Sequence, residues 1–430
     1  MWSILLICIG VPRVGGFVGG LSKQNPRWSN SRIKVPSNLC LTPDSIPSPD
    51  SIPSPKKKKL QPFLRFLEVE CWKKREFRDL EPVLRAVMAA CQQMNRLVQR
   101  AQTDDLYGVA DPSGGANVQG EVQQQLDVLC NTIMLQSLCG CSDAIVAVAS
   151  EEEDLPRNCR TDVLKQQSMG STPATLKMGQ FVACFDPLDG SKNIDSSLPV
   201  GTVFGIFRVP PGTTADASEK TFLMRGDSCL VAAGYCLYSA TTVLVLTLKG
   251  SGVHGFTLDP DTGLFLHTLR DIRIPPKGHI YSFNEAYFHD YNHAVQRYLN
   301  ALKSGNSATM GKRANARYVG ALVADVHNIL INGGIYGYPA TTAHPSGKLR
   351  LLYESAPMAL ILEQAGGAAS TGYGRLLDVI PQSIHQRVPT FLGSVENIYE
   401  IDQFHEYYTD ENDEKTKEVQ SIDYYIQNMA

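Results

Sequence analysis

Two aspartates separated by a Pro-Leu pair, Asp186 and Asp189, are the residues of this 430-residue chain best suited to do chemistry. They follow the apolar run 181–185 and lie directly before Gly190 and Ser191, where the backbone can be approached closely. Hard divalent cations prefer several oxygen ligands, and a phosphate ester needs its charge neutralised before water can attack it. The segment therefore indicates metal-dependent hydrolysis of phosphate esters.

A second group of acids, Glu151, Glu152 and Glu153, also follows a strand-like run, at residues 144–149. Taken alone, three acids at a strand end would more often form a solvated turn. Open α/β sheets collect ligand sites at the ends of their strands, so the two groups could converge on one site. Glu354 precedes a predicted helix, where an isolated acid would ordinarily only favour the helix start.

Alternating strand and helix patterns from residue 60 onward must position these acids. Apolar residues recur at helical spacing in residues 79–101 and 119–138. Apolar runs predict strands at residues 144–149, 181–185, 202–209, 230–238 and 241–248. Beyond residue 276 we expect helices at 292–303, 319–332 and 356–365, with extended segments at 278–283 and 334–339. Strands interleaved with helices predict a layered α/β fold.

The first 58 residues have the composition of a targeting leader, because no acid precedes Asp44 and basic residues are spread among Ser and Asn. A tail without structure or a misplaced start codon is the alternative. The apolar run 4–11 is too short for a membrane span, which needs about 20 residues. The repeat at 43–54 and the lysines at 56–59 cannot build a core and are expected to form a linker.

The bulk composition bounds the class of protein. With 43% hydrophobic and 19% charged residues the chain is typical of a soluble globular protein, and a net charge of −3 argues against general nucleic-acid binding. Its 11 cysteines include no CxxC pair, and Cys139 and Cys141 form only a weak metal signal. We expect most cysteines to be reduced and to pack as small hydrophobic residues.

The ordered set of motifs resembles the fructose-1,6-bisphosphatase family from about residue 62 to residue 403. The matching segments are 106–108, 125–129, 150–152, 185–191, 200–206, 230–238, 316–320, 347–354 and 384–387. The Asp-Pro-Leu-Asp-Gly motif alone would indicate only the wider superfamily of lithium-sensitive, metal-dependent sugar and inositol phosphatases. The resemblance implies a layered α/β/α/β/α fold and a homotetramer.

The resemblance also implies a metal centre with roughly two or three Mg²⁺ ions per subunit, for which Mn²⁺ could substitute. The implied metal ligands are Glu121, Glu151, Asp186, Asp189, Glu354 and the carbonyl oxygen of Leu188. Asp127 and Glu152 match the family pair that orients and deprotonates the attacking water, since paired acids near a cation can share a proton. The alternative for Glu121 and Asp127 is a solvated helix, and Glu121 would not share a face of an ideal helix with Asp127.

The two substrate phosphates would be held by separate groups of residues. Gly190, Ser191 and Lys192 would face the phosphate to be cleaved. The distal phosphate needs cations and hydroxyl donors, and the matching positions are Asn284, Tyr287, Arg317, Tyr318, Tyr338, Lys348 and Arg350. In the family, the residue matching Arg317 reaches across a subunit interface. His385 is expected to be structural.

Departures from the family pattern bear on regulation. Animal members are inhibited by AMP, but their Lys-Tyr pair before the motif strand is Gln180-Phe181 here, although Arg208 remains, so we expect weak or absent inhibition. Light-regulated plastid members carry a cysteine-bearing loop after the strand at 202–209. Residues 209–228 contain no cysteine, so redox control through that loop is not expected. Lys192, where a small Ser is common, is similar to the plastid type that lacks the loop.

The leading prediction is hydrolysis of the C1 phosphate of fructose 1,6-bisphosphate. Sedoheptulose-1,7-bisphosphatase is the alternative enzyme because it shares the metal-binding acids, and a non-catalytic sugar-phosphate sensor is less favoured because every required acid is present. The expected partner is a small sugar bisphosphate, with no nucleic acid and no membrane. The leader favours a plastid, with the cytoplasm as alternative. The predicted divisions are 1–58 (leader and linker), 60–240 (metal-binding acids), 241–408 (sugar-phosphate-binding residues) and 409–430 (polar tail).

Overall fold

The computed structural model describes residues 60–106, 108–110, 123–142, 144–159, 180–212 and 216–408. The predicted leader, the candidate ligand Glu121 and the predicted tail from residue 409 lie outside these ranges. Within them, none of the helices combines the length and the apolar character needed to cross a bilayer.

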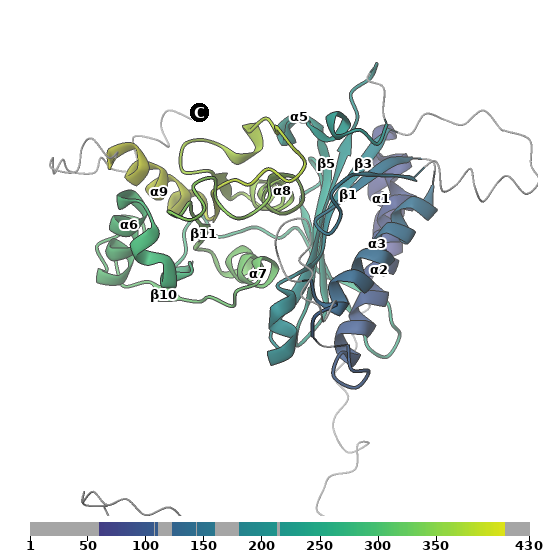
Figure 1. Ribbon diagram of the computed structural model, residues 1–430, viewed down its shortest axis with the longest axis horizontal. Helices are drawn as coiled ribbons and strands as arrows, with labels where there is room; N and C mark the ends of the chain where they lie inside the picture. The colour runs from purple at the N-terminus through teal and green to yellow at the C-terminus, as the bar shows by residue number, and fades with distance from the viewer. Residues whose placement is uncertain are drawn as a thin grey trace, which may run out of the picture. The chain divides into compact units, whose positions relative to one another are not determined.

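The larger sheet of the described chain has eight strands in the order β2-β1-β3-β4-β5-β6-β7-β8 (Figure 1). The strands are β1 (Ile145–Ser150), β2 (Arg157–Asn158), β3 (Phe181–Asp189), β4 (Val200–Arg208), β5 (Leu230–Tyr238), β6 (Val243–Leu248), β7 (Val253–Leu258) and β8 (Phe265–Leu269). Strands β1 and β3 are parallel neighbours, so their acid-bearing ends meet at one edge. The sheet continues to Leu269, so the predicted division near residue 240 falls inside it.

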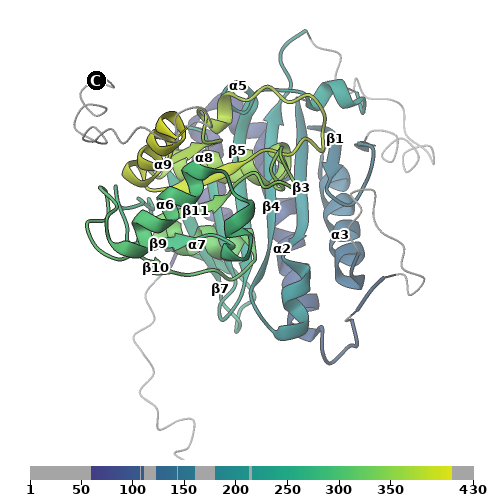
Figure 2. The same cartoon turned by 60° about the vertical axis from the view of Figure 1, so that its left-hand side comes forward.

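Three helices cover one face of this sheet: α1 (Phe63–Lys73), α2 (Glu81–Arg100) and α3 (Gln125–Cys141) (Figure 1; α2 and α3 are also labelled in Figure 2). Their apolar residues, such as Val87 and Leu126, form one core with the facing sheet residues. Helix α3 begins later than the predicted residue 119, because Gln124 and Asp127 close a capping box at its start. Helix α1 was not predicted from the sequence.

A second sheet has the strand order β10-β9-β11-β13-β12. Its strands are β9 (Ile280–Ser282), β10 (Asn315–Ala316), β11 (Ile335–Tyr338), β12 (Ala368–Ser370) and β13 (Thr390–Gly393). Helices α7 (Leu322–Asn332) and α8 (Ala356–Gln364) lie between the two sheets, and α6 (His293–Ser304) and α9 (Val395–Tyr407) pack on the outer face. The described residues therefore confirm the predicted α/β/α/β/α layering.

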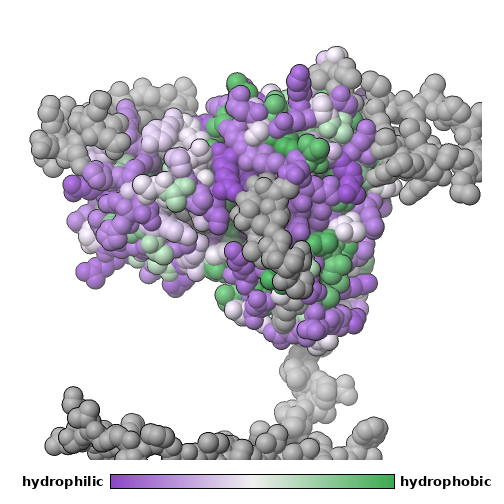
Figure 3. All heavy atoms as spheres, viewed as in Figure 1, coloured by the Kyte–Doolittle hydropathy of each residue, from purple (hydrophilic) through white to green (hydrophobic). Residues whose placement is uncertain are grey.

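Short helical turns complete the described chain: η4 (Arg75–Leu80), η5 (Ser191–Ser196), η6 (Glu219–Phe222), α5 (Gly226–Cys229), η7 (Glu285–Asp290), η8 (Leu351–Ser355) and η9 (Leu376–Asp378). The face drawn in Figure 3 is largely hydrophilic. This is the pattern expected when the apolar residues are buried between the layers.

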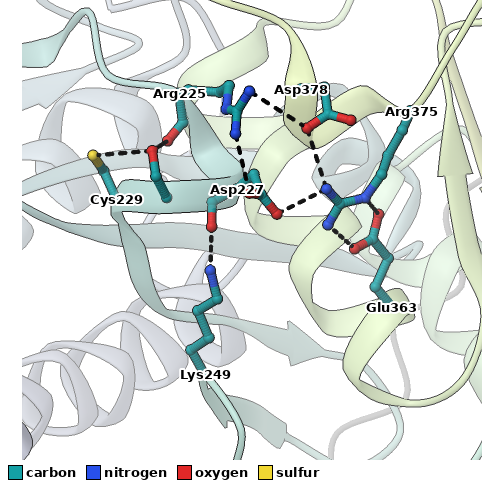
Figure 4. Close-up of polar contacts among 8 residues, drawn as sticks. Arg225, Asp227, Cys229, Lys249, Glu363, Arg375 and Asp378 are labelled. Atoms are coloured by element: carbon teal, nitrogen blue, oxygen red, sulfur yellow. Dashed lines mark hydrogen bonds and ion pairs between the residues drawn. The ribbon is translucent and has the colours of Figure 1, made fainter.

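A cluster of ion pairs ties α5 to α8 and η9 (Figure 4). The Arg375 guanidinium donates to both carboxylate oxygens of Glu363, at 3.0 and 2.7 Å, and lies 2.7 Å from an oxygen of Asp227. All three side chains are partly exposed, so each pair is expected to contribute no more than about 1 kcal/mol. The cluster links the first sheet to the C-terminal half of the chain.

A disulfide between Cys139 and Cys159, with Cα atoms 4.5 Å apart, joins the end of α3 to the residue after β2. The expectation that most cysteines are reduced is met by seven other described cysteines, which are free thiols. It was wrong for this pair. The cross-link encloses β1 and the acids that follow it.

We expect reduction of this disulfide to lower the free energy of unfolding by about 3 kcal/mol, because the bond closes a short loop in the unfolded chain. Urea denaturation with and without dithiothreitol measures the change, and a Cys139→Ala/Cys159→Ala variant should behave like the reduced protein. Cys141→Ala, which removes a nearby free thiol, is the control. Activity well below the unfolding midpoint should be the same in both redox states, and a large gain on reduction would contradict this expectation.

Candidate active site

A cavity of about 260 Å³ lies where the ends of β1 and β3 meet the segments around Asn284, Tyr318 and Arg350. Nearly every predicted site residue lines it, namely Asp127, Glu151, Glu152, Asp186, Leu188, Asp189, Gly190, Ser191, Lys192, Asn284, Tyr287, Tyr318, Tyr338, Lys348, Arg350 and Glu354. Arg317 does not line the cavity. The predicted convergence of the two acid groups is therefore found in the structure.

Strand β3 delivers both aspartates to the cavity, because it continues through the motif and pairs with β4 on either side of an irregularity between Asp186 and Asp189. The Leu188 backbone N–H donates to Asp186 Oδ1 at 3.0 Å, and the Val323 backbone N–H donates to Asp189 Oδ2 at 2.8 Å. Gly190 has a φ of 75°, and a Cβ there would lie 2.6 Å from the Ala321 Cβ. Only glycine fits this turn without displacing α7.

Glu151 and Glu354 reach the cavity from distant parts of the sequence. Both lie near the buried guanidinium of Arg350. Arg350 Nη1 lies 2.8 Å from Glu151 Oε1 and 3.8 Å from Glu354 Oε2, and its guanidinium side chain is only 4% exposed. The Arg350 backbone N–H also donates to Glu354 Oε2 at 2.6 Å, within the π-helical turn η8. Arg350, predicted as a ligand of the distal phosphate, is thus placed among the acids.

Burial and mutual repulsion favour the protonated forms of these acids. Burial, followed by the charge of Glu354, raises the pKa of Glu151 to about 8. Burial raises the pKa of Asp189 to about 7, and burial together with the Glu151 charge raises the pKa of Asp186 well above its ordinary value. Added positive charge would relieve this repulsion.

The oxygen-only donor set fits a hard cation such as Mg²⁺. In the described part of the chain, however, no three acidic, His or Cys side chains already meet in the arrangement of a metal site. The hydrogen bonds from Arg350, Leu188 and Val323 occupy several of the carboxylate oxygens instead.

Asp127 and Glu152 also line the cavity, and each is anchored by a neighbouring amide. Asp127 Oδ2 accepts from the Gln124 backbone N–H at 2.8 Å, and the Gln123 side chain donates to Glu152 Oε2 at 2.6 Å. Burial, then the charge of Glu152, raises the pKa of Asp127 to about 7, and Ser191 is hydrogen bonded to it. A carboxyl group that titrates near neutral pH is suited to proton transfer.

A hydrogen-bond chain that was not predicted fixes Glu152 relative to α3. The Ser150 hydroxyl donates to Asn131 Oδ1 at 2.7 Å, and the Glu152 backbone N–H donates to Ser150 Oγ at 3.2 Å. Asn131 lies one turn after Asp127 on α3. In the sequence, only the four-residue spacing of Asp127 and Asn131 places them on one face of a helix. That this face meets Ser150 becomes clear only when β1 is seen to pack beside α3.

The far wall of the cavity carries hydroxyl and amide groups. Tyr318 and Asn284 are hydrogen bonded to each other, and Tyr287 and Tyr338 lie beside them. Asp325, which the sequence analysis missed, accepts from the backbone N–H groups of residues 319 and 320 at 2.9 and 3.0 Å. Its carboxylate thereby holds the loop that presents Tyr318.

Arg317 lies just outside this wall. Its guanidinium donates to the carbonyl oxygen of Ala316 at 2.9 Å, and the side chain is exposed. The residue therefore does not contact the cavity of its own chain, and its predicted role requires a neighbouring subunit.

Without divalent cations, we expect the folded protein to lose stability as the pH rises from 6.5 to 8.5. Asp127, Glu151 and Asp189 have pKa values of about 7 to 8 when folded, but ordinary carboxyl values near 4 when unfolded. The native state therefore binds more protons in this window, and losing them destabilises it. His267 and His327, whose pKa values are lowered by desolvation to about 4, change stability only at lower pH.

Urea denaturation in a chelating buffer measures this pH effect. Repeating the pH 8.5 experiment with Mg²⁺ should restore much of the lost stability, since the cation binds only the folded state. An unfolding midpoint that does not change between pH 6.5 and 8.5 in chelator would show that these acids are not buried together.

The chain is similar to known proteins along both halves of its described part. Residues 65–270 match the family model "Fructose-1-6-bisphosphatase, N-terminal domain", and residues 274–406 match "Fructose-1-6-bisphosphatase, C-terminal domain". A chloroplastic fructose-1,6-bisphosphatase of Triticum aestivum is 42% identical over 335 residues, covering 76% of this chain and 77% of the relative. Fructose-1,6-bisphosphatase 1, chloroplastic, of Arabidopsis thaliana is 41% identical over 338 residues, covering 76% of each.

A solved structure agrees with these sequence matches. Leishmania major fructose-1,6-bisphosphatase in its holo form superposes with a TM-score of 0.72 and 33% sequence identity. The match covers 81% of this chain and 100% of that one.

Proposed function

The chain belongs to the fructose-1,6-bisphosphatase family, and from this premise we propose that it hydrolyses the C1 phosphate ester of fructose 1,6-bisphosphate, releasing fructose 6-phosphate and phosphate. The observation that carries the proposal is the meeting of Glu151, Asp186, Asp189 and Glu354 with the Asp127–Glu152 pair in one cavity. The same cavity also offers the hydroxyl, amide and lysine groups that a second phosphate needs.

Mg²⁺ is the proposed cofactor, with Mn²⁺ as a substitute. The carboxylates of Glu151, Asp186, Asp189 and Glu354 and the carbonyl of Leu188 would hold it, and Glu121 lies outside the described residues. When bound, the cation would neutralise the phosphoryl oxygens and activate the attacking water.

The protein's own residues would position the ester and move the proton. Gly190, Ser191 and Lys192 would bind the phosphate to be cleaved through backbone, hydroxyl and ammonium donors. Asp127, whose pKa lies near neutrality, would take the proton of the attacking water and share it with Glu152.

The distal phosphate would be bound by Asn284, Tyr287, Tyr318, Tyr338 and Lys348. Arg317 would complete this group in the cavity of a neighbouring subunit, which agrees with the exposure of its side chain. We therefore propose a homotetramer. Arg350 would act mainly on the acids, where its guanidinium lies.

A plastid is the proposed location, because the Triticum aestivum and Arabidopsis thaliana relatives are chloroplastic proteins and the first 58 residues have the composition of a leader. Fusing those residues to a fluorescent protein tests this proposal. A cytoplasmic signal would contradict it.

A substrate panel tests the activity. The purified protein with Mg²⁺ is expected to release phosphate from fructose 1,6-bisphosphate far faster than from fructose 6-phosphate or inositol 1-phosphate. A preference for sedoheptulose 1,7-bisphosphate would favour the alternative enzyme. Binding of the sugar bisphosphate without phosphate release would indicate the non-catalytic sensor.

AMP is expected to inhibit weakly or not at all. Gln180 lines a surface cavity with Lys74, Arg75 and Arg78, where animal members have a lysine. The Arg208 guanidinium is already engaged, since it donates to the Glu76 carbonyl oxygen and lies 5.0 Å from the Phe181 ring centre. An AMP titration measures the effect, and a Gln180→Lys/Phe181→Tyr variant should become more sensitive. Inhibition of the unmodified enzyme at micromolar AMP would refute the expectation.

A further inference from the structure

His385 joins two acid-bearing turns that are remote from each other in the sequence, at Asp154 and at Tyr353. The Tyr353 hydroxyl lies 2.8 Å from His385 Nδ1, and His385 Nε2 lies 3.2 Å from the carbonyl oxygen of Asp154. A carbonyl oxygen can only accept, so Nε2 carries the proton and Nδ1 accepts from the tyrosine hydroxyl. The imidazole thus bonds in one tautomer to both turns.

The turn that contains Tyr353 is closely packed against the His385 segment. Tyr353 is fully buried, directly before Glu354, and its ring meets the His385 ring edge-on at 5.9 Å. The backbone next to His385 pairs with the turn, because the Leu351 N–H donates to the Gln386 carbonyl at 2.8 Å. Burial lowers the pKa of His385, which favours the neutral ring that these bonds require.

The other side of the link is the turn after β1. Asp154 follows Glu151, Glu152 and Glu153, and the Glu151 backbone N–H donates to the Phe185 carbonyl at 3.2 Å. This bond attaches the first residue of the turn, Glu151, to β3. His385 instead contacts the last residue of the turn, Asp154, and connects it to η8. Together with the Arg350–Glu151 ion pair, His385 is a second link between the turn and η8.

We propose that His385 is a positioning residue, which sets the separation of Glu151 and Glu152 from Glu354 so that these carboxylates can hold divalent cations together. The inference rests on the proposed function. Arg350 already contacts Glu151 and lies near Glu354, and His385 adds a hydrogen-bonded link between the same two turns. Without His385, only the Arg350 contacts would hold the two turns at this separation. Displacements of about 1 Å in such sites can cost on the order of 10²-fold in rate.

The test is direct Mn²⁺ binding to the full chain, measured by electron paramagnetic resonance without substrate. His385→Ala is expected to weaken Mn²⁺ binding by about 10-fold, the usual effect of losing a residue that orients metal ligands. KM for fructose 1,6-bisphosphate at saturating Mg²⁺ should change little, because the distal group lies on the other wall. His385→Gln can still donate to Asp154 and should recover part of the affinity.

The chain offers a matched control in a second pair of a buried tyrosine and a half-buried histidine. The Tyr235 hydroxyl lies 2.7 Å from His327 Nδ1, and neither residue lines the cavity. His327→Ala removes a comparable bond and is expected to lower thermal stability without changing Mn²⁺ affinity. Tyr353→Phe removes one of the two bonds of His385 and should add nothing to the effect of His385→Ala, because the two residues act as one unit.

The outcomes separate the inference from the function on which it rests. Wild-type activity together with normal Mn²⁺ affinity of His385→Ala would overturn the positioning role and leave the proposed function standing. Equal loss of Mn²⁺ affinity in His327→Ala would also overturn it, because the loss would then report general destabilisation. A wild-type chain that neither binds Mn²⁺ nor hydrolyses the sugar would overturn both. Should His385→Ala fail to fold, Tyr353→Phe and His385→Gln give the same decision.

Discussion

Replacing Asp127 with Ala is expected to lower kcat for fructose 1,6-bisphosphate by roughly 10²–10⁴-fold, the usual contribution of a general acid–base group. Asp127 is buried at the start of α3, and its pKa is raised to about 7 by burial and by the charge of Glu152. It can therefore take a proton near neutral pH, which an alanine cannot do. Steady-state kinetics with Mg²⁺ measure the loss, and equilibrium titration should show that the sugar bisphosphate still binds.

Two controls separate chemistry from folding in this experiment. Asp127 also accepts from the Gln124 backbone N–H, so Asp127→Ala removes a helix cap and should cost about 1 kcal/mol of stability. Asp127→Asn keeps an oxygen for that bond but cannot take the proton, and it should lose turnover with smaller loss of stability. A near-normal kcat in either variant would show that the role is misassigned.

Replacing Arg350 with Met is expected to lower the unfolding free energy of the metal-free protein by about 3–5 kcal/mol, the usual result of removing one partner from a buried ion pair. The Arg350 side chain is 4% exposed and lies against Glu151 and Glu354, so its loss leaves buried carboxylates without a counter-charge. Urea denaturation at pH 8 in chelator measures the change. The same experiment with Mg²⁺ should recover much of it, because a bound cation supplies the missing charge.

Lys348→Met is the matched control for the arginine variant. Lys348 lines the same cavity two residues away but is only half-buried, so its loss should change stability by no more than about 0.5 kcal/mol. It should instead raise KM, since Lys348 is proposed to bind the distal phosphate. A stable Arg350→Met protein that does not respond to Mg²⁺ would contradict the counter-charge role.

The secondary structure was well predicted where the apolar pattern is continuous. Strand β5 was predicted with its observed bounds, and α2 and α8 agree to within two residues at each end. Helix α1 and helix α9 were not predicted, although both lie in the described chain. Their apolar residues are interspersed with charged ones, so their helical face is recognisable only once a core is known to pack against it.

The end of strand β3, which carries the two aspartates of the motif, was not predicted correctly from local sequence patterns. The prediction ended this strand at residue 185, where the apolar run stops, and placed a turn at the Pro-Leu pair between the two aspartates. In the structure β4 pairs beyond an irregularity, so the strand continues to Asp189 and carries both aspartates. Pairing with a distant strand decided the geometry of the motif.

The sequence by itself determined which groups are available for chemistry, and its carboxylates, glycine-containing turn and hydroxyl donors predicted metal-assisted hydrolysis of a sugar phosphate. Only the tertiary structure decided which of these groups lie close enough to interact. It placed Arg350 among the acids, joined Cys139 to Cys159, and brought His385 between two turns. The physical reason is that burial and distance set electrostatic energies and hydrogen bonds, and both depend on how remote segments pack.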